Sequence, residues 1–131
     1  MRYLAVLLAV AALAIAGCSG DEGTVIDTTL RNDAIELSQL TVDTGAVTFA
    51  VTNEGDKVHE IEVFAGSNTD LPVDKEVADV SGLRLVDEIE DILPGGNVRL
   101  TLDLPPGDYV IICNLPGHYQ MGMVAKLVVA G

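Results

Sequence analysis

The chain has 131 residues, which is enough for one domain and leaves no room for a second hydrophobic core. Its 20 acidic and 7 basic residues give a formal net charge of −13, and this acidity argues against nucleic acid as a partner because phosphates would repel it. The charge favours a cationic partner, although solubility or a saline habitat accounts for it at least as well.

The N-terminal segment differs from the rest of the chain. Arg2 is its only charged residue, and residues 4–15 consist of Leu, Ala, Val and Ile. This apolar run is too short for a comfortable membrane span and is typical of a secretory signal. It ends in Ile-Ala-Gly-Cys at residues 15–18, which resembles the bacterial lipobox, where the cysteine (here Cys18) is lipidated and becomes the new N-terminus. The alternatives are a plain signal peptide and an N-terminal anchor helix with an incidental cysteine.

These features predict three regions. Residues 1–17 would be a lipoprotein signal peptide, residues 18–23 a lipidated cysteine with a polar tether, and residues 24–131 the folded domain. Such a tether reaches about 20 Å at most. We therefore expect an exported protein, lipid-anchored to the bacterial cell membrane and facing the periplasm or the exterior.

The second cysteine poses a question. If Cys18 carries lipid, Cys113 has no partner for an internal disulfide. An unpaired thiol in an oxidising compartment is a liability unless it is buried or binds something.

From residue 24 onward, alternating apolar and polar residues with many β-branched side chains indicate β-strands. We predict strands at residues 25–30, 35–37, 46–52, 58–64, 98–104, 109–113 and 123–129. Residues 83–92 fit a strand or a helix, and we favour a strand. Seven or eight short strands separated by turns predict an all-β fold, an antiparallel Greek-key sandwich or barrel. Its core must be aliphatic, because only 4% of the residues are aromatic and Trp is absent.

Two local features complete the prediction. Residues 65–82 are rich in Gly, Ser, Asn, Thr and Asp, and we expect them to be the least ordered part, with one short helix around residues 73–80. Tyr109 follows a Pro-Gly turn, and we expect its hydroxyl to bond to nearby backbone, as in a tyrosine corner.

The stretch from Tyr109 to Met123 concentrates metal-binding side chains. Cys113, His118 and Met123 follow one another at intervals of five residues. Five extended residues cover about 17 Å, so the segment must double back for these side chains to meet, and Pro-Gly at residues 116–117 supplies the turn. Thiolate, imidazole and thioether together suit copper.

Each of these residues has a plain structural interpretation when taken alone. Cys113 could be a small buried hydrophobe and Met123 an ordinary core residue. The upstream histidine, His59, could be a core or surface residue of its strand. Their joint occurrence indicates a metal site, although zinc could also occupy it in a purified sample.

These segments resemble the cupredoxins, and most closely the small plastocyanin-like bacterial copper proteins. The resemblance rests on Asn-Glu-Gly-Asp-Lys-Val-His at residues 53–59, Pro-Gly-Asp-Tyr at 106–109, Cys-Asn-Leu-Pro-Gly-His at 113–118 and Gly-Met at 122–123. It covers nearly all of residues 25–129 and implies a cupredoxin-like copper domain.

The resemblance implies a ligand set for one type 1 copper ion. His59, Cys113 and His118 would form a trigonal plane, with Met123 as a weak, long axial ligand. Met121 is the less suitable methionine because it follows His118 too closely for the loop to close comfortably.

The resemblance also implies an electron port, which is the exposed edge of His118. Tyr119, Met121 and Pro116 would form an apolar rim around this edge.

One feature departs from the family pattern. Many members have Asn after the first histidine, and its amide bridges to a hydroxyl residue that follows the cysteine. Here Glu60 follows His59, and Asn114 follows Cys113. We therefore expect the roles to be exchanged, with the Asn114 amide donating a hydrogen bond to the Glu60 carboxylate. Such bonds orient ligands and tune the metal.

The implied function is electron transfer. A monomeric, lipid-tethered blue copper protein would pass single electrons between membrane-associated or periplasmic redox proteins, such as a cationic c-type cytochrome or a membrane oxidoreductase. The sequence has no nucleophile–base pair or substrate-pocket motif, so we do not expect an enzyme. A binuclear copper centre would need a second cysteine in the loop. The alternatives are a copper-binding module for storage, delivery or sensing, and a structural sandwich with a vestigial site.

Overall fold

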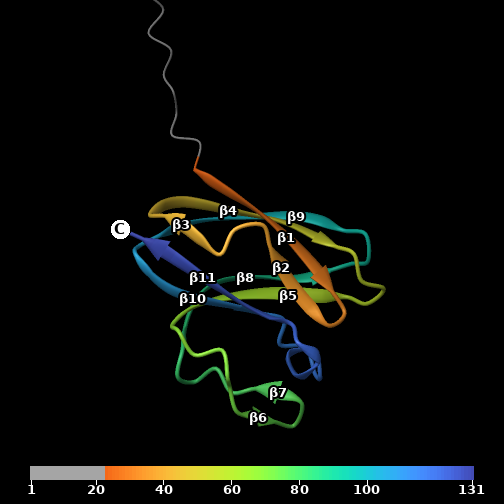
Figure 1. Cartoon of the computed structure of the whole chain (residues 1–131). Helices are drawn as coiled ribbons and strands as arrows, with labels where there is room; N and C mark the ends of the chain where they lie inside the picture. Colours follow the sequence, from red (N-terminus) through yellow and green to blue (C-terminus); the bar gives the residue numbers. More distant parts are fainter. Residues whose placement is uncertain (1–22) are drawn as a thin grey trace, which may run out of the picture.

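The computed structural model describes residues 23–131 (Figure 1). The predicted signal peptide at residues 1–17, the lipidation site at Cys18 and all of the tether except Gly23 lie outside this range. Within it, no helix has the length and apolar character needed to cross a membrane.

Two β-sheets pack face to face (Figure 1). The four-stranded sheet has the order β2-β1-β4-β9, and the five-stranded sheet has the order β3-β11-β10-β5-β8. A separate hairpin consists of β6 and β7. The strands are β1 (Thr24–Arg31), β2 (Ala34–Leu37), β3 (Thr41–Asp43), β4 (Gly45–Asn53), β5 (His59–Ala65), β6 (Val73–Asp74), β7 (Val77–Ala78), β8 (Arg84–Ile92), β9 (Asn97–Leu104), β10 (Gly107–Ile112) and β11 (Val124–Ala130), and a 3-10 turn, η1, spans Tyr119–Met121.

The predicted all-β sandwich is confirmed, and every segment predicted as a strand forms one, including residues 83–92. The expectation of purely antiparallel sheets is wrong for two pairs, because β1 runs parallel to β4 and β3 runs parallel to β11. Between β1 and β4 the chain crosses to the other sheet through β3, and such a crossover permits parallel pairing. Side-chain alternation reports which face is buried but not the direction of the neighbouring strand.

The predicted helix at residues 73–80 is also wrong. This region forms the β6–β7 hairpin, in which Asp74 pairs with Val77 across a two-residue turn. The turn residues Lys75 and Glu76 have φ angles of 48° and 70°. Such turns favour Asn-Gly, so the Lys-Glu sequence gave no hairpin signal.

The alternating pattern builds the core between the sheets. Most inward positions of β4 and β9 are buried, whereas Asp103 and the other outward residues of β9 are exposed. Tyr109 donates its hydroxyl to the carbonyl oxygen of Pro105 at 2.7 Å, which confirms the predicted tyrosine corner. A second apolar cluster lies on the outer face of the five-stranded sheet, beneath the segment that carries the hairpin, and it consists of Phe64, Leu71, Ala78, Val110 and Ile112.

Strand β8 forms one edge of the five-stranded sheet. Its exposed side chains include four acids, Asp87, Glu88, Glu90 and Asp91. Only β5 pairs with it in the sheet, so one row of its backbone groups lacks a strand partner within residues 23–131.

Candidate metal centre

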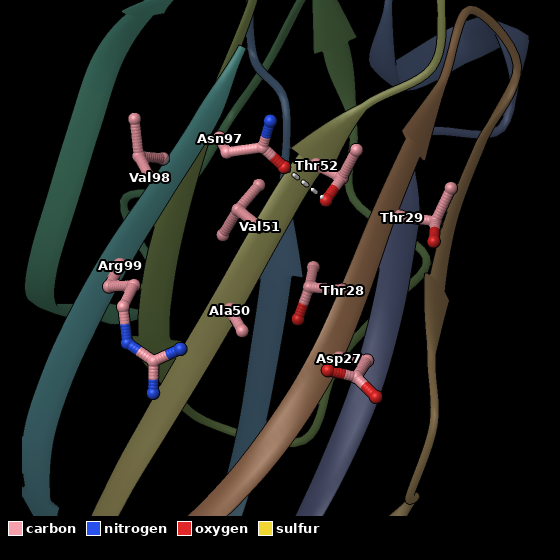
Figure 2. Close-up of a pocket in the computed structure, with 9 residues that line it drawn as sticks. All are labelled: Asp27, Thr28, Thr29, Ala50, Val51, Thr52, Asn97, Val98 and Arg99. Carbon is pink, nitrogen blue, oxygen red and sulfur yellow. Dashed lines mark hydrogen bonds between the residues drawn. The ribbon is translucent and has the colours of Figure 1, made fainter. Parts of the chain in front are cut away.

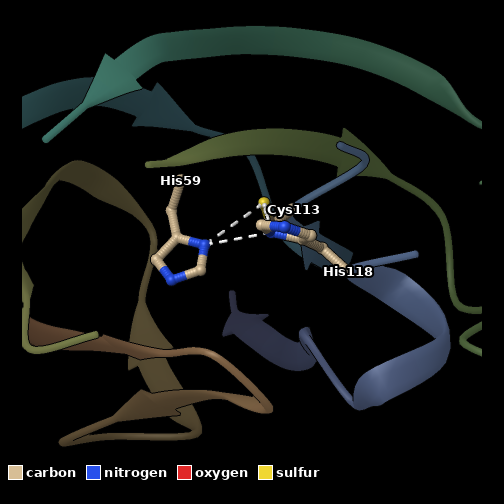
Figure 3. Close-up of side chains that lie close together, drawn as sticks. All are labelled: His59, Cys113 and His118. Carbon is tan, nitrogen blue, oxygen red and sulfur yellow. Dashed lines mark hydrogen bonds between the residues drawn. The ribbon is translucent and has the colours of Figure 1, made fainter. Parts of the chain in front are cut away.

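Three side chains from two parts of the chain meet at one end of the sandwich (Figure 3). His59 begins β5, Cys113 directly follows β10, and His118 lies in the loop that leads to η1. Because β5 and β10 are antiparallel neighbours, the start of one lies beside the end of the other. The turn at residues 116–117 then brings His118 back over Cys113.

The three potential ligand atoms form a small triangle. The two Nδ1 atoms of His59 and His118 are 3.1 Å apart, and Sγ of Cys113 lies 3.4 Å from Nδ1 of His118 and 3.9 Å from Nδ1 of His59. The circle through these atoms has a radius of about 2.0 Å, close to the metal–nitrogen and metal–sulfur bond lengths of about 2.0–2.3 Å known for zinc. One metal ion at the centre would therefore fit these side chains without rearrangement.

Burial prepares these groups for a metal. His59 and Cys113 are fully buried, and His118 reaches the surface in part. Burial lowers the pKa of both histidines. The positive charge of Lys57 lowers both pKa values further, and His118 adds to the effect on His59. Both imidazoles are thus neutral at neutral pH, as coordination requires. Burial raises the pKa of the Cys113 thiol, so metal binding would release its proton.

His59 is oriented by Asn32, which is in turn held by Asp56. Its Nε2 lies 3.3 Å from Oδ1 of Asn32, in the turn between β1 and β2, and the amide of Asn32 donates to Asp56 at 2.6 Å. Because this amide nitrogen is engaged by Asp56, Oδ1 faces the imidazole and accepts the Nε2 proton, which leaves Nδ1 free to face the other ligands. Asp56 lay within the motif of residues 53–59, but no local signal pointed to Asn32.

Gly55 is required by this arrangement. A Cβ atom at this position would collide with Oδ1 of Asn32 and would lie 2.8 Å from Nε2 of His59. The glycine therefore makes room for the contact between these two side chains.

The predicted bond between Glu60 and Asn114 forms with a different group. The backbone N–H of Asn114, and not its side-chain amide, donates to Oε1 of Glu60 at 3.1 Å. The side chain of Asn114 instead bonds to the backbone of Ala78. The prediction paired the correct residues but missed the competing strand β7, whose backbone supplies both a donor and an acceptor. The backbone N–H of Glu60 also points at Sγ of Cys113, at 3.5 Å.

The remaining predicted residues occupy different positions. Met123 is fully buried, and its backbone bonds to Cys113 and His118. Met121 and Pro116 are exposed, as expected for a rim. Tyr119 instead packs against the second apolar cluster, and its hydroxyl bonds to the segment between β5 and β6. Tyr119 is half-buried and is held by these contacts, so its place on the rim stays a prediction.

A surface groove of about 350 Å³ lies elsewhere, over β1, β4 and β9 (Figure 2). Threonines and Asn97 line it, with Asp27 and Arg99 at its lower end in the figure, and Thr52 donates to Asn97 at 2.8 Å. This groove is separate from the metal cluster. Within residues 23–131, His59, Cys113 and His118 are the one group of three His, Cys, Asp or Glu side chains placed to hold a metal.

Comparisons with known proteins agree with this fold. Residues 3–129 match the family model of the cupredoxin-like domain. The fold is similar to dithionite-reduced auracyanin from the photosynthetic bacterium Roseiflexus castenholzii, with a TM-score of 0.65 and 25% identity over 83% of this chain and 98% of that chain. It is also similar to auracyanin A, a "blue" copper protein from Chloroflexus aurantiacus, with a TM-score of 0.62 and 24% identity over 82% of this chain and 99% of that chain.

A curated relative is the iron uptake system component EfeO of Escherichia coli (strain K12). It is 27% identical over 127 residues, which cover 95% of this chain. The chain spans only 30% of the length of that relative.

Proposed function

The chain belongs to the cupredoxin-like domain family, and on this premise we propose that it is a type 1 copper protein that carries single electrons between redox partners. The observation that carries the proposal is the triangle of two imidazole nitrogens and one thiol sulfur. Two histidines and one cysteine in a trigonal arrangement are the donor set of blue copper sites.

The ligand residues supply what an electron carrier needs. Copper bound there would provide a one-electron couple between Cu(I) and Cu(II). The buried side chains of His59 and Cys113 exclude water, and the two strands that present them fix their separation. His118 is the ligand that reaches the surface, so its imidazole edge is the shortest route to a partner.

We propose Met123 as the axial ligand. Its side chain is fully buried, its N–H donates to the carbonyl of His118 at 3.3 Å, and its carbonyl accepts the N–H of Cys113 at 3.2 Å. Met121, which is 42% exposed, lacks such ties to Cys113. A thioether stabilises Cu(II) less than a stronger axial donor would, which keeps the reduction potential high.

The protein's surroundings are proposals based on its sequence. The lipobox-like Cys18 supports an exported, lipid-anchored protein, and the net charge of −13 supports a cationic partner such as a c-type cytochrome or a membrane oxidoreductase. We propose that the protein is not an enzyme, since nothing in its sequence points to a substrate site.

The second candidate function is metal handling, meaning storage, delivery or sensing. It is favoured by the 27% identity to an iron uptake component. The burial of Cys113 and His59 favours electron transfer instead, because a delivery site must release its metal readily.

One experiment separates these functions. Cu(II) added to the domain is expected to give the intense blue band of thiolate-to-copper charge transfer, and Cys113→Ser should abolish it. The blue protein should then be reduced and reoxidised repeatedly without losing copper to a chelator. A colourless protein, or one that gives up copper at once, would contradict electron transfer.

A further inference from the structure

The segment between β5 and β8, residues 66–83, lies beside the loop that carries Cys113, His118 and Met123, residues 113–123 (Figure 1). We call the first the hairpin segment and the second the ligand loop. We propose that the hairpin segment is a clamp that positions the ligand loop, with Asn114 and Tyr119 as positioning residues. The inference rests on the proposed function for its purpose, but the contacts that carry it do not involve the metal.

The first contact is made by Asn114, the residue after Cys113. Its side-chain oxygen accepts the N–H of Ala78 at 2.8 Å, and its side-chain nitrogen donates to the carbonyl of Ala78 at 3.2 Å. The amide thus extends β7 as a strand neighbour would. Since the backbone N–H of Asn114 bonds to Glu60, the residue is held on both sides, and Cys113 with it.

The second contact is made by Tyr119, the residue after His118. Its hydroxyl donates to the carbonyl of Thr69 at 2.6 Å and accepts the N–H of Leu71 at 2.8 Å. Leu71 is buried, with 7% of its surface exposed. Loss of the hydroxyl would leave the N–H of this buried residue without its acceptor, and an unpaired donor costs more than a bond from which both partners are removed.

The third contact is made by Gly117, the residue before His118. Its N–H donates at 2.8 Å to the carbonyl of Glu76, in the hairpin turn. Both turn residues, Lys75 and Glu76, hold positive φ angles that side chains rarely adopt. Backbone strain of this kind persists only where the surroundings enforce it, and it often marks a functional contact.

Together these contacts bracket His118. Its own side chain is partly exposed, yet the residues immediately before and after it are bonded to the hairpin segment. The hairpin segment is in turn anchored to the sheet, because Leu71 and Ala78 pack on Phe64 and Ile112 in the second apolar cluster. His118 is therefore fixed through its backbone, without a metal to hold it.

The clamp is tested by a matched pair of variants. Tyr119→Phe and Tyr109→Phe each remove one hydroxyl that bonds to backbone, but only the hydroxyl of Tyr119 bonds to the hairpin segment. Amide hydrogen exchange in the metal-free protein should quicken by about five- to a hundredfold at Gly117 and Leu71 in Tyr119→Phe, relative to amides of β4. Tyr109→Phe should leave the ratio of exchange rates, Gly117 and Leu71 over the β4 amides, unchanged. Equal ratios in the two variants would overturn the proposal.

A variant with a relaxed hairpin turn and a measurement of copper release complete the test. The double variant Lys75→Asn/Glu76→Gly relieves the backbone strain of the turn and keeps the carbonyl at position 76 that accepts the N–H of Gly117. Amide exchange at Gly117 should therefore slow. Unchanged or faster exchange would contradict the clamp. Copper release to a chelator should be faster in Tyr119→Phe than in Tyr109→Phe, and equal rates would also contradict it. If the wild-type protein binds no copper, the proposed function fails, while the exchange measurements still decide the clamp.

Discussion

Glu62 makes the folded protein sensitive to pH. It lies in β5 opposite Ile112 on one side and Glu88 on the other. Its Oε2 is buried and has no hydrogen-bond partner within residues 23–131. Burial, followed by the negative charges of Glu60, Glu88 and Glu90, raises the pKa of Glu62 from 4.5 to about 7.

The direction of the effect follows from linkage. Because the pKa is higher in the folded than in the unfolded state, folding is favoured by the protonated form. That stability is fully present below pH 4.5 and is lost as the pH rises through about 7. The full shift corresponds to about 3 kcal/mol. Since the Glu62 side chain is only half-buried, solvent screening reduces the effect to about 1–2 kcal/mol.

Glu62→Gln should therefore stabilise the protein by about 1–2 kcal/mol at pH 8.5 and by a smaller amount, less than about 1 kcal/mol, at pH 5. Urea unfolding of both proteins at the two pH values measures the difference. Asp103→Asn, which removes one negative charge from an exposed position, controls for the general relief of repulsion. An equal gain at both pH values, or a loss at pH 8.5, would refute the reasoning.

Three further predictions concern the site. Gly55→Ala places a methyl group against His59 and should lower copper affinity about 10- to 100-fold. Gly82→Ala is the control, because its methyl group would have no other atom within 4 Å and should leave the affinity unchanged. Equal affinities in copper titrations of the two variants would contradict the prediction. Met123→Leu should raise the reduction potential, measured by voltammetry, while the blue colour persists. If the potential shifts in Met121→Leu instead, Met121 and not Met123 is the axial ligand. Electron transfer to a cationic cytochrome should slow as salt shortens the screening length from about 10 Å at 0.1 M to about 3 Å at 1 M, and stopped-flow rates independent of salt would exclude electrostatic docking.

The parts of the structure that could be predicted are those that depend on the chemical type of the side chains. Alternation of apolar and polar residues located the strands, because it reports burial directly. Cys113 and His118 lie in one short motif. His59 stood out because the chain has only two histidines.

The parts that could not be predicted depend on backbone groups and distant turns. The side chain of Asn114 bonds to the backbone of Ala78, and every residue type except proline offers the same backbone donor and acceptor. Asn32 reaches His59 across 27 residues of sequence. The Lys75–Glu76 turn contradicts local preference and forms where its carbonyl meets Gly117.

The exposed edge at β8 has a consequence for self-association. An open strand of nine residues is a template on which another chain could add a strand. Four carboxylates along this edge, Asp87, Glu88, Glu90 and Asp91, would face those of a second copy, and their repulsion opposes such pairing. These carboxylates thus oppose strand addition to β8 at neutral pH, and acidification would weaken their repulsion at this edge of the five-stranded sheet.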